Sequence, residues 1–351
     1  MKILVLNGGS STFKCWFHDV REPLPVEAPQ PEWETHIEWD PQKPLAEQLD
    51  PVLAGKQPEV VGHRIVHGGN ARVTTLITPQ LRSAIAREAE FAPSHNRFEL
   101  EAIEAIDHLL GPPTRQIAVF DTAFHATLDP AAYTYPGPYA WLEQGVRRYG
   151  FHGISYQYAT RRAAHLLGQP AESLRLILCH LGNGASLAAV RNGKSIDTTM
   201  GFTPLEGLMM GTRSGSIDPG ILVYLLRHCG YTADQLDRIL NRESGLKGIS
   251  GVSGDMREIL SAVAGGNPRA QLAFDIYAHR VVREAGAMLA VLGGMDALVF
   301  TGGVGENCFP LRDRVRSQLS AIGLQFPVLV IHAQEEWEIA RECYELLTSS
   351  R

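Results

Sequence analysis

Short apolar runs and longer amphipathic stretches alternate along the whole chain. The apolar runs are bounded by glycine or polar residues, which predicts buried strands over residues 2–6, 12–18, 60–66, 116–120, 174–180, 187–190, 297–300 and 328–331. Apolar residues at helical spacing predict helices over residues 80–91, 98–110, 155–167, 217–228, 235–240, 271–292 and 336–347. Strands that alternate with helices in this way indicate an α/β fold.

Two segments break the alternation. Residues 28–57 are rich in proline and polar side chains and show no clear period, so we expect them to form an irregular, variable part of the first domain. Asn192-Gly193 separates two apolar runs, and this dipeptide is typical of a tight hairpin turn.

Two glycine-rich turns resemble each other. Residues 6–11 and 181–186 each join two predicted strands, and they lie about 175 residues apart. The echo suggests a duplicated architecture in which two domains face each other. The alternative is coincidence, because short turns rich in glycine are common.

Length and charge exclude several classes of protein. A chain of 351 residues is long enough for about two domains. The net charge is −6 and no basic run is apparent, which argues against a nucleic-acid partner. No apolar run approaches the ~20 residues of a membrane helix, and the apolar start is too short for a signal peptide. The five cysteines are scattered without metal-binding spacing, so we expect reduced thiols in the cytoplasm.

The two glycine-rich turns are candidate phosphate-binding loops. Small residues let backbone N–H groups approach phosphate oxygens, hydroxyls add donors, and Lys14 adds charge. Ordinary tight turns are the alternative for both segments. The Walker A pattern is absent from the chain, and no GxGxxG follows the first strand, which weakens a dehydrogenase interpretation.

Arg64 and Arg213 each lie among glycines and apolar residues. A buried guanidinium is costly without an anionic partner, and it binds carboxylates and phosphoryl groups in a two-pronged manner. A structural ion pair is the alternative for each arginine.

Four further features are ambiguous when taken singly. Asp121 ends a predicted strand, where side chains of α/β folds tend to face a ligand, and helix capping is the alternative. His152 alone would more often be a structural histidine. The glycine-rich segment 301–307 and Asp255 suit a nucleotide pocket, or a plain turn and a helix cap.

Taken together and in this order, these segments resemble the acetate kinase family closely. The matching segments are LNGGSSTFK (6–14), GHRIVHGG (62–69), VFDTAFH (119–125), RRYGFHG (147–153), HLGNGASL (180–187), DTTMGFTPLEGLMMGTRSGSIDP (197–219), SGVSGDMR (250–257), FTGGVGEN (300–307) and EEWEIARE (335–342). The resemblance implies the duplicated, two-domain actin-like ATPase (ribonuclease H-like) fold shared with sugar kinases. It also implies reversible phosphoryl transfer from ATP to acetate, magnesium as cofactor, and a homodimer.

The resemblance also implies residue roles. Arg64, Asp121, His152 and Arg213 match the catalytic residues, and Arg64, Val66, Ser94 and Pro204 match the substrate pocket. Asn7 and Glu335 match residues near magnesium. The nucleotide-binding matches are Ser10, Thr12, Lys14, His180, Asn183, Gly184, Asp255, Met256, Arg257, Gly303, Gly305 and Asn307. The implied domains are residues 1–123 with 336–351 and residues 124–335, with the active site in the cleft between them.

Chemistry and departures from the family refine this prediction. A carboxyl group with a pKa near ~4 is ionised at neutral pH, so we expect Asp121 to orient Arg64, Arg213 or the magnesium shell rather than accept a proton. Ser94 stands where the family usually has leucine, and Ile154 and Tyr156 replace a usual threonine and histidine. Two alternatives therefore stay open: a kinase for propionate or another short-chain acid, and a non-catalytic nucleotide sensor. Retention of all four catalytic matches argues against the sensor.

Overall fold

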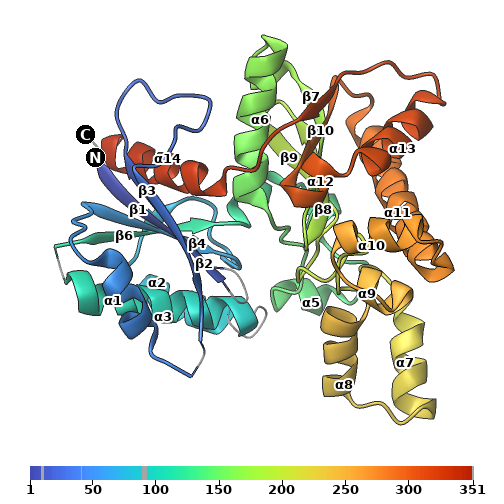
Figure 1. The fold of residues 1–351 in the computed structure, drawn as a ribbon, viewed down its shortest axis with the longest axis horizontal. Helices are drawn as coiled ribbons and strands as arrows, with labels where there is room; N and C mark the ends of the chain where they lie inside the picture. Colours follow the sequence, from blue (N-terminus) through green and yellow to red (C-terminus); the bar gives the residue numbers. More distant parts are fainter. Residues whose placement is uncertain (9–11, 41, 89–92, 112, 350–351) are drawn as a thin grey trace. The chain divides into compact units, whose positions relative to one another are not determined.

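The computed structural model describes residues 1–8, 12–40, 42–88, 93–111 and 113–349; for residues 12, 88 and 93–97 it describes the backbone alone. The chain divides into two compact units (Figure 1). Unit 1 comprises Met1–Ala126, Phe151–Tyr158 and Gln334–Arg351, and unit 2 comprises Thr127–Gly150 and Ala159–Ala333. The segment Phe151–Tyr158, which the sequence division assigns to the second domain, thus clusters with unit 1.

Unit 1 contains a sheet of six strands in the order β3-β2-β1-β4-β6-β5. The strands are β1 (Lys2–Gly8), β2 (Thr12–Asp19), β3 (Trp33–Glu38), β4 (Val60–Ile65), β5 (Thr75–Leu76) and β6 (Arg115–Phe120). Strand β1 pairs antiparallel with β2 and parallel with β4, and β4 pairs parallel with β6. The carboxyl ends of β1, β4 and β6 therefore meet at one edge of the sheet.

Helices cover both faces of this sheet. They are α1 (Leu45–Leu53), α2 (Pro79–Glu88), α3 (Pro93–Leu110) and α14 (Glu335–Thr348). Leu4, Leu6 and Val61 face α1 and α3 in one apolar core. Helix α14 packs on the other face, and there a Cβ on Gly62 of β4 would lie 2.7 Å from Cys343 Sγ and 2.8 Å from Ile339. Glycine at this position therefore lets α14 approach the strand closely.

Unit 2 contains a sheet of five strands in the order β11-β10-β7-β8-β9. The strands are β7 (Arg175–Leu181), β8 (Ala185–Arg191), β9 (Lys194–Thr198), β10 (Ala297–Thr301) and β11 (Val328–Val330). Asn192 and Gly193 take φ values of 57° and 72° in the turn from β8 to β9, as expected for this hairpin dipeptide.

Helix α11 is the central helix of unit 2 and packs on β7, β8 and β9. The other helices are α4 (Pro130–Tyr133), α5 (Tyr139–Glu143), α7 (Pro219–His228), α8 (Ala233–Arg238), α9 (Gly245–Ser250), α10 (Met256–Ala264), α11 itself (Pro268–Leu292), α12 (Gly302–Asn307) and α13 (Phe309–Ser320). Helix α6 (Gly153–Leu167) begins in unit 1 and ends in unit 2. Short 3₁₀ turns span Ala123–Thr127 and Ala171–Ser173, and a π-turn spans Ile239–Glu243.

The two sheets repeat one topology. Strands β3-β2-β1-β4-β6 of unit 1 correspond in order and sense to β9-β8-β7-β10-β11 of unit 2. The duplication that the glycine-rich turns suggested is therefore present in the strand order, and the predicted α/β fold is confirmed.

The expectation that residues 28–57 are irregular is wrong. The segment contains β3, whose residues alternate between half-buried and exposed, and α1, which buries Leu45, Leu49 and Leu53. Leucines spaced by four residues are a helical signal, but Pro44 before the helix and Pro51 within it obscured the signal.

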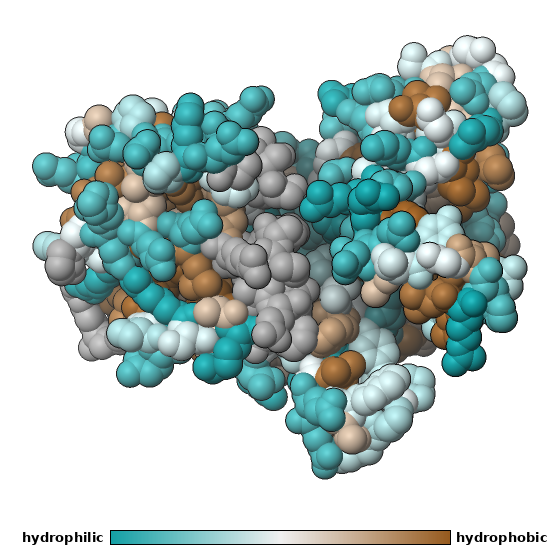
Figure 2. All heavy atoms as spheres, turned by 90° about the horizontal axis from the view of Figure 1, so that it is seen from below, coloured by the Kyte–Doolittle hydropathy of each residue, from teal (hydrophilic) through white to brown (hydrophobic). Residues whose placement is uncertain are grey.

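The surface is mixed in character. Hydrophilic residues dominate the face seen in Figure 2, and patches of hydrophobic residues interrupt them. Among the described residues, no helix has both the length and the hydropathy that a membrane span requires.

Candidate active site

Three predicted residues of unit 1 meet at the edge where the parallel strands end. Asn7 lies near the end of β1, Arg64 lies near the end of β4, and Asp121 directly follows β6. The Asp121 N–H donates to Ile65 O at 3.0 Å, which continues the ladder between β4 and β6 past the last strand residue. Sheet pairing therefore joins residues that are more than 50 positions apart in sequence.

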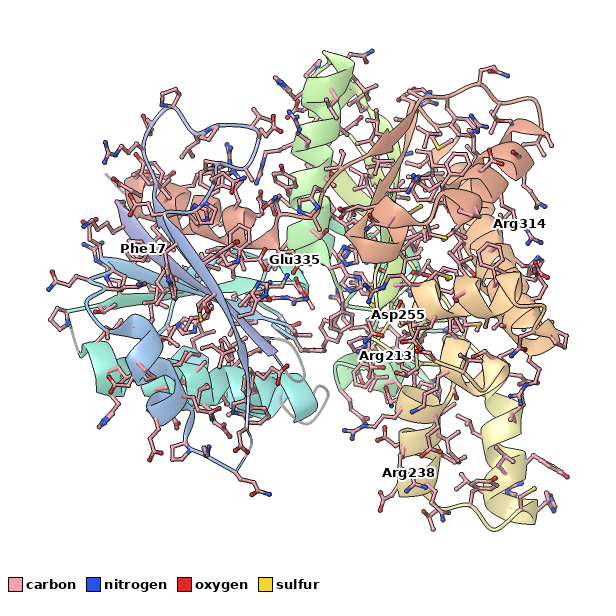
Figure 3. The ribbon with its side chains drawn as sticks, viewed as in Figure 1. Phe17, Arg213, Arg238, Asp255, Arg314 and Glu335 are labelled. Carbon is pink, nitrogen blue, oxygen red and sulfur yellow. The ribbon has the colours of Figure 1, made fainter. Side chains whose placement is uncertain are left out.

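Arg64 is the centre of a polar network. Its Nε and Nη2 atoms donate to Asp121 Oδ2 at 3.0 and 2.6 Å, and its Nη1 donates to Asn7 Oδ1 at 3.0 Å. Glu335, the first residue of α14, lies 3.6 Å from Arg64 Nη1 and accepts from Asn7 Nδ2 at 3.1 Å (Figure 3). The structure thus brings together Asn7, Arg64, Asp121 and Glu335, as the sequence predicts.

Burial and pairing oppose each other in this network. Burial lowers the pKa of Arg64, but Asp121 and Glu335 outweigh it, so the pKa of the guanidinium is raised overall. Burial raises the pKa of Asp121, while Arg64 opposes the shift. The side chain of Arg64 is only 16% exposed, so the guanidinium is held charged in one orientation.

Glu336 is a residue that sequence reasoning did not assign. Its Oε1 atom accepts from Asn7 Nδ2 at 2.9 Å and lies 3.2 Å from Lys14 Nζ. It therefore ties the predicted phosphate-loop lysine to the Arg64 network. The signal was available, because Glu336 adjoins Glu335 in the EEWEIARE segment.

His152 lies in a strained turn that packs against Asp121. Its φ is 60°, an unusual value for a residue other than glycine. The next residue, Gly153, donates its N–H to Asp121 O at 2.9 Å, and a Cβ there would lie 2.2 Å from that oxygen. His125 Nε2 lies 3.0 Å from Phe151 O and fixes the other side of the turn. A conformation held in this way is typical of functional sites.

Tyr156, one of the departures from the family pattern, is fully buried. Its ring lies edge-on to the rings of His125 and His152, with centroids 5.7 and 6.5 Å apart. The tyrosine therefore packs beneath the His152 turn.

The predicted substrate pocket is described in part. Val66 is buried, and its N–H donates to Glu99 Oε1 at 2.9 Å. Glu99 is 3% exposed, and burial raises its pKa to about 8 although the bond from Val66 opposes the shift. Sequence reasoning missed this buried carboxyl of α3, which carries no local signal. The backbone of Ser94 belongs to the same helix, but its side chain lies outside the described part of the chain.

Unit 2 contains a cavity of about 680 Å³ at the carboxyl ends of β7 and β10. Its lining is Gly182, Asn183, Gly254, Asp255, Met256, Arg257, Leu260, Gly303, Val304, Asn307 and Cys308. Six predicted nucleotide-binding residues are among them: Asn183, Asp255, Met256, Arg257, Gly303 and Asn307. The volume suits a small-molecule ligand.

Close backbone packing and a helix cap lie beside or within this cavity lining. Gly302 takes a φ of 77°, and a Cβ there would lie 2.8 Å from Leu181 O, so glycine lets the two strand ends approach. Asp255 caps α10 by accepting from the Arg257 N–H at 2.8 Å, and the Arg257 side chain, which also hydrogen-bonds to it, lowers its pKa. The capping alternative and the cavity-lining prediction therefore both hold for Asp255.

Three predicted nucleotide-binding residues of unit 2 do not line the cavity: His180, Gly184 and Gly305. His180 is a buried residue of β7. The Gly184 carbonyl accepts from the Gly182 N–H at 2.9 Å, and this bond lies within the turn between β7 and β8. Ser10 lies outside the described residues, as does the side chain of Thr12.

Arg213 differs from Arg64 in its partners. Its Nη1 donates to Pro204 O at 3.2 Å and lies 3.9 Å from Met210 Sδ. Within the described residues no carboxylate forms an ion pair with it, and burial lowers its pKa. Figure 3 marks Arg213 and Asp255 in unit 2. A half-buried cation with no carboxylate partner among the described residues is suited to an anionic ligand.

A metal site is only partly formed by the chain. Asn7 and Glu335 lie side by side, but the described residues hold no group of three or more His, Cys, Asp or Glu side chains that could bind a metal ion. Magnesium in phosphoryl-transfer enzymes takes one or two carboxylates and completes its shell with phosphates and water. The donors present fit such a nucleotide-bound ion and do not fit an all-protein cage.

Comparisons with known proteins identify the family of this chain. The model of the Acetokinase family matches residues 45–341. The acetate kinase of Gloeobacter violaceus is 50% identical, with 99% of this chain and all of the relative covered. A crystal structure of Porphyromonas gingivalis acetate kinase is 38% identical, covers 99% of both chains and superposes with a TM-score of 0.88. A propionate kinase structure from Francisella tularensis is 35% identical, covers 97% of this chain and 98% of its own, and has a TM-score of 0.87.

Proposed function

Because the chain belongs to the acetokinase family, we propose that it transfers the γ-phosphoryl group of ATP to acetate and yields acetyl phosphate and ADP. Two separate observations, one within each unit, carry the proposal. Unit 1 holds Arg64 charged and oriented, and unit 2 holds a cavity of about 680 Å³ together with Arg213, which forms no ion pair with the described residues. We propose that the two units contribute to one reaction.

The reaction needs positioning and charge neutralisation more than proton transfer. An acetate oxygen attacks the γ-phosphorus, a new O–P bond forms, and the bond to the β-bridging oxygen breaks as ADP leaves. Acetate is already ionised at neutral pH, so no general base is required. Asp121 serves as the group that orients Arg64, since its bonded oxygen accepts both the Nε and Nη2 protons of that arginine.

Three cationic or donor groups stabilise the charge that the phosphoryl group carries during transfer. Arg64 and Arg213 bind the carboxylate and the equatorial phosphoryl oxygens, and His152 donates to the same oxygens from its fixed turn. Arg213 gains the anionic partner that the described part of the protein does not provide.

We propose magnesium as the cofactor, held near Asn7 and Glu335. The ion, when bound with the nucleotide, neutralises phosphate charge. In the structure the Asn7 side-chain amide accepts a hydrogen bond from Arg64 and donates one to Glu335. Asn7 therefore sets the separation between the Arg64 guanidinium and the Glu335 carboxylate.

Acetate is favoured over propionate as substrate. The relative at 50% identity is named an acetate kinase, whereas the propionate kinase structure is 35% identical. A purified sample tested with ATP, magnesium, hydroxylamine and either acetate, propionate or butyrate decides the matter. We expect the highest kcat/KM for acetate; a higher value for propionate would overturn the choice, and no turnover with any acid would favour a nucleotide sensor.

We propose a homodimer, and exposed apolar side chains on α7 support it. Ile221, Val223, Tyr224 and Leu226 are between 45% and 58% exposed, and no residue of the helix is buried. Light scattering of the purified protein is expected to give twice the chain mass, and Leu226→Asp is expected to give monomers. A monomeric wild-type protein would refute the proposal. The cytoplasmic location stays a prediction.

A further inference from the structure

The loop that follows β9 is bonded to Arg213, so the two proposed substrate-contacting residues of unit 2, Pro204 and Arg213, are in contact. Residues 199–206 leave the end of β9 and contain Pro204, and the Pro204 carbonyl accepts from Arg213 Nη1 at 3.2 Å. Among the described residues this carbonyl is the only oxygen bonded to the Arg213 side chain. The position of the guanidinium therefore depends on the position of the loop.

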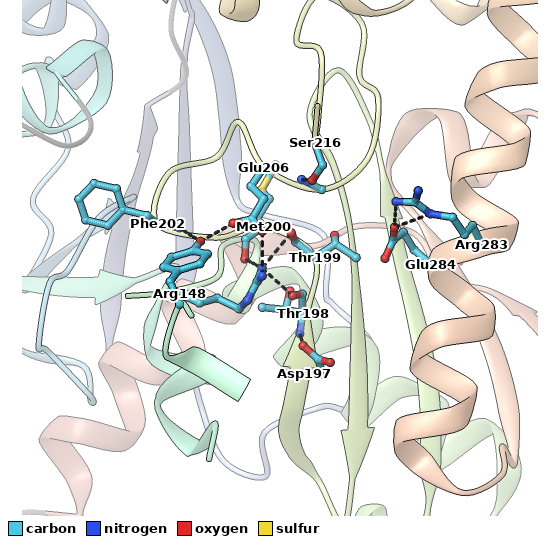
Figure 4. A network of polar contacts seen from close by, with 12 residues as sticks. Arg148, Asp197, Thr198, Thr199, Met200, Phe202, Glu206, Ser216, Arg283 and Glu284 are labelled. Carbon is cyan, nitrogen blue, oxygen red and sulfur yellow. Dashed lines mark hydrogen bonds and ion pairs between the residues drawn. The ribbon is translucent and has the colours of Figure 1, made fainter. Parts of the chain in front are cut away.

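One arginine ties both ends of the loop together. Arg148 Nη1 donates to the consecutive carbonyls of Thr198, Thr199 and Met200 at 3.1, 3.0 and 2.9 Å (Figure 4). Its Nη2 donates to Glu206 Oε1 at 2.9 Å. The Arg148 side chain is 17% exposed, so these bonds are formed away from most of the solvent.

A tyrosine completes the network, and it comes from the same segment as Arg148, Thr127–Gly150. The Tyr135 hydroxyl donates to Glu206 Oε2 and accepts from the Phe202 N–H at 2.9 Å. Burial raises the pKa of Tyr135, which keeps the hydroxyl protonated as a donor. Glu206 thus receives one bond on each oxygen, from two residues that lie outside the loop.

Gly201 shows how closely the network is packed. A Cβ at this position would lie 1.6 Å from Glu206 Oε2 and 2.1 Å from the Tyr135 hydroxyl. The Gly201 carbonyl accepts from the Tyr149 N–H at 3.0 Å, so the loop backbone is also fixed from this side. A methyl group at Gly201 would displace the network without removing any of its groups.

We propose that Arg148, Glu206 and Tyr135 are positioning residues that fix the loop 199–206 and, through the Pro204 carbonyl, hold Arg213 in its working position. The inference rests on the proposed function and extends it. An irregular loop has no ladder of its own to fix it, and a displacement of about 1 Å in a positioning contact is sufficient to slow an enzyme about 100-fold.

The test uses the variants Arg148→Gln, Glu206→Gln and Gly201→Ala in full-length protein. We expect kcat/KM for acetate to fall about 10- to 100-fold in each. The KM for ATP is expected to change less than about threefold, because the nucleotide cavity is lined by other residues. Arg148→Lys is expected to behave like Arg148→Gln, because a single ammonium group cannot span the four acceptors.

Arg283→Gln is the matched control. Arg283 is 53% exposed on α11 and bonds to its neighbour Glu284, so its loss is expected to leave the kinetics unchanged. Wild-type values of kcat/KM in Glu206→Gln and Gly201→Ala, with or without a lower melting temperature, would overturn the positioning role. If Arg148→Gln does not fold, the other two variants still decide the question. Wild-type protein that forms no acetyl phosphate would instead overturn the proposed function.

Discussion

The two units share a strand order but prepare their arginines differently. In both, the candidate ligand groups lie where the central parallel strands end: β1, β4 and β6 in unit 1, β7 and β10 in unit 2. Unit 1 fills that edge with charged side chains, and Arg64 is bonded to Asp121 and Asn7. Unit 2 leaves a cavity lined by residues of α10, α12 and nearby loops, and Arg213 is bonded to one carbonyl oxygen.

The comparison shows that the duplicated fold places candidate ligand-binding groups at corresponding strand ends in both units. The charged side chains at those strand ends differ. Arg64 is oriented before any ligand binds, and its charge is already balanced. Arg213 is half-buried and has no carboxylate partner in the described part of the chain, so its charge is left for an anionic ligand. Ion pairing thus distinguishes unit 1, whose arginine is oriented before a ligand binds, from unit 2, whose arginine is available to pair with an anionic ligand.

The largest expected effect removes either cation. Arg64→Ala and Arg213→Ala are each expected to lower kcat for acetyl phosphate formation by about 10³-fold or more, since a single arginine contributes about that much to phosphoryl transfer. Steady-state rates with saturating ATP measure this. The matched control Arg283→Gln is expected to retain wild-type activity, and activity within tenfold of wild type in either alanine variant would contradict the assignment.

Stability is expected to separate the two arginines. Arg64→Ala leaves Asp121 and Glu335 without their cation, and breaking such a buried pair costs about 3–5 kcal/mol. Arg213→Ala removes a half-buried charge that forms no ion pair with the described residues, so the free energy of unfolding is expected to change by about 1 kcal/mol or less. Urea unfolding of both variants measures the difference, and equal losses would refute the contrast between a paired and an unpaired cation.

The nucleotide cavity of unit 2 gives a smaller effect. Asn183 lines the cavity, and Asn183→Ala is expected to raise the KM for ATP about tenfold, because a hydrogen bond to a charged group contributes about 1.5–3 kcal/mol. The KM for acetate is expected to stay within about twofold. Kinetics with each substrate varied in turn provide the measurement, and a selective rise in the KM for acetate would contradict the role.

The last expected effect concerns Glu99 in unit 1 and appears as a pH dependence of stability rather than as a change in activity. Burial raises its pKa to about 8 from an ordinary 4.5, so between these pH values the folded protein holds a proton that the unfolded chain has lost. Its contribution to stability is therefore full below pH 4.5 and is lost as the pH rises to about 8, with a slope of ~1.4 kcal/mol per pH unit at most.

Glu99→Gln keeps the shape of the side chain and removes this titration. Relative to wild type, the variant is expected to gain stability steadily between pH 5 and pH 8, and urea unfolding at several pH values measures the gain. A constant difference across the range would show that Glu99 does not retain its proton on folding.

Much of the fold could be predicted from the sequence because local pattern and turn chemistry agreed. The apolar runs of β1, β7 and β10 and the Asn192-Gly193 turn each carry their own signal. Strand β3 and helix α1 were missed, because prolines interrupted the pattern on which the prediction relied. The burial of three leucines on one face, which decides the helix, is a tertiary property.

The candidate site divides in the same way. Glycine-flanked arginines, an aspartate after a strand and glycine-rich turns are visible in the sequence, and the ordered set predicts the family. The pairing of Arg64 with Asp121, 57 residues apart, depends on the register of β4 and β6, which no local pattern specifies. Glu99 carries no motif of its own, and Glu336 lies in a matched segment without an assigned role; the importance of both follows from what they contact.

The sequence by itself therefore determined the kinds of groups available: two arginines, a histidine, carboxylates and glycine-rich loops in a recognisable order. Only the tertiary structure decided that Asp121 balances the charge of Arg64. It also decided that Arg213 hydrogen-bonds to a carbonyl of the loop 199–206, which the bond between Arg148 and Glu206 fixes. The physical reason is that charge, burial and hydrogen bonding are set by neighbours in space, and strand pairing chooses those neighbours from distant parts of the chain.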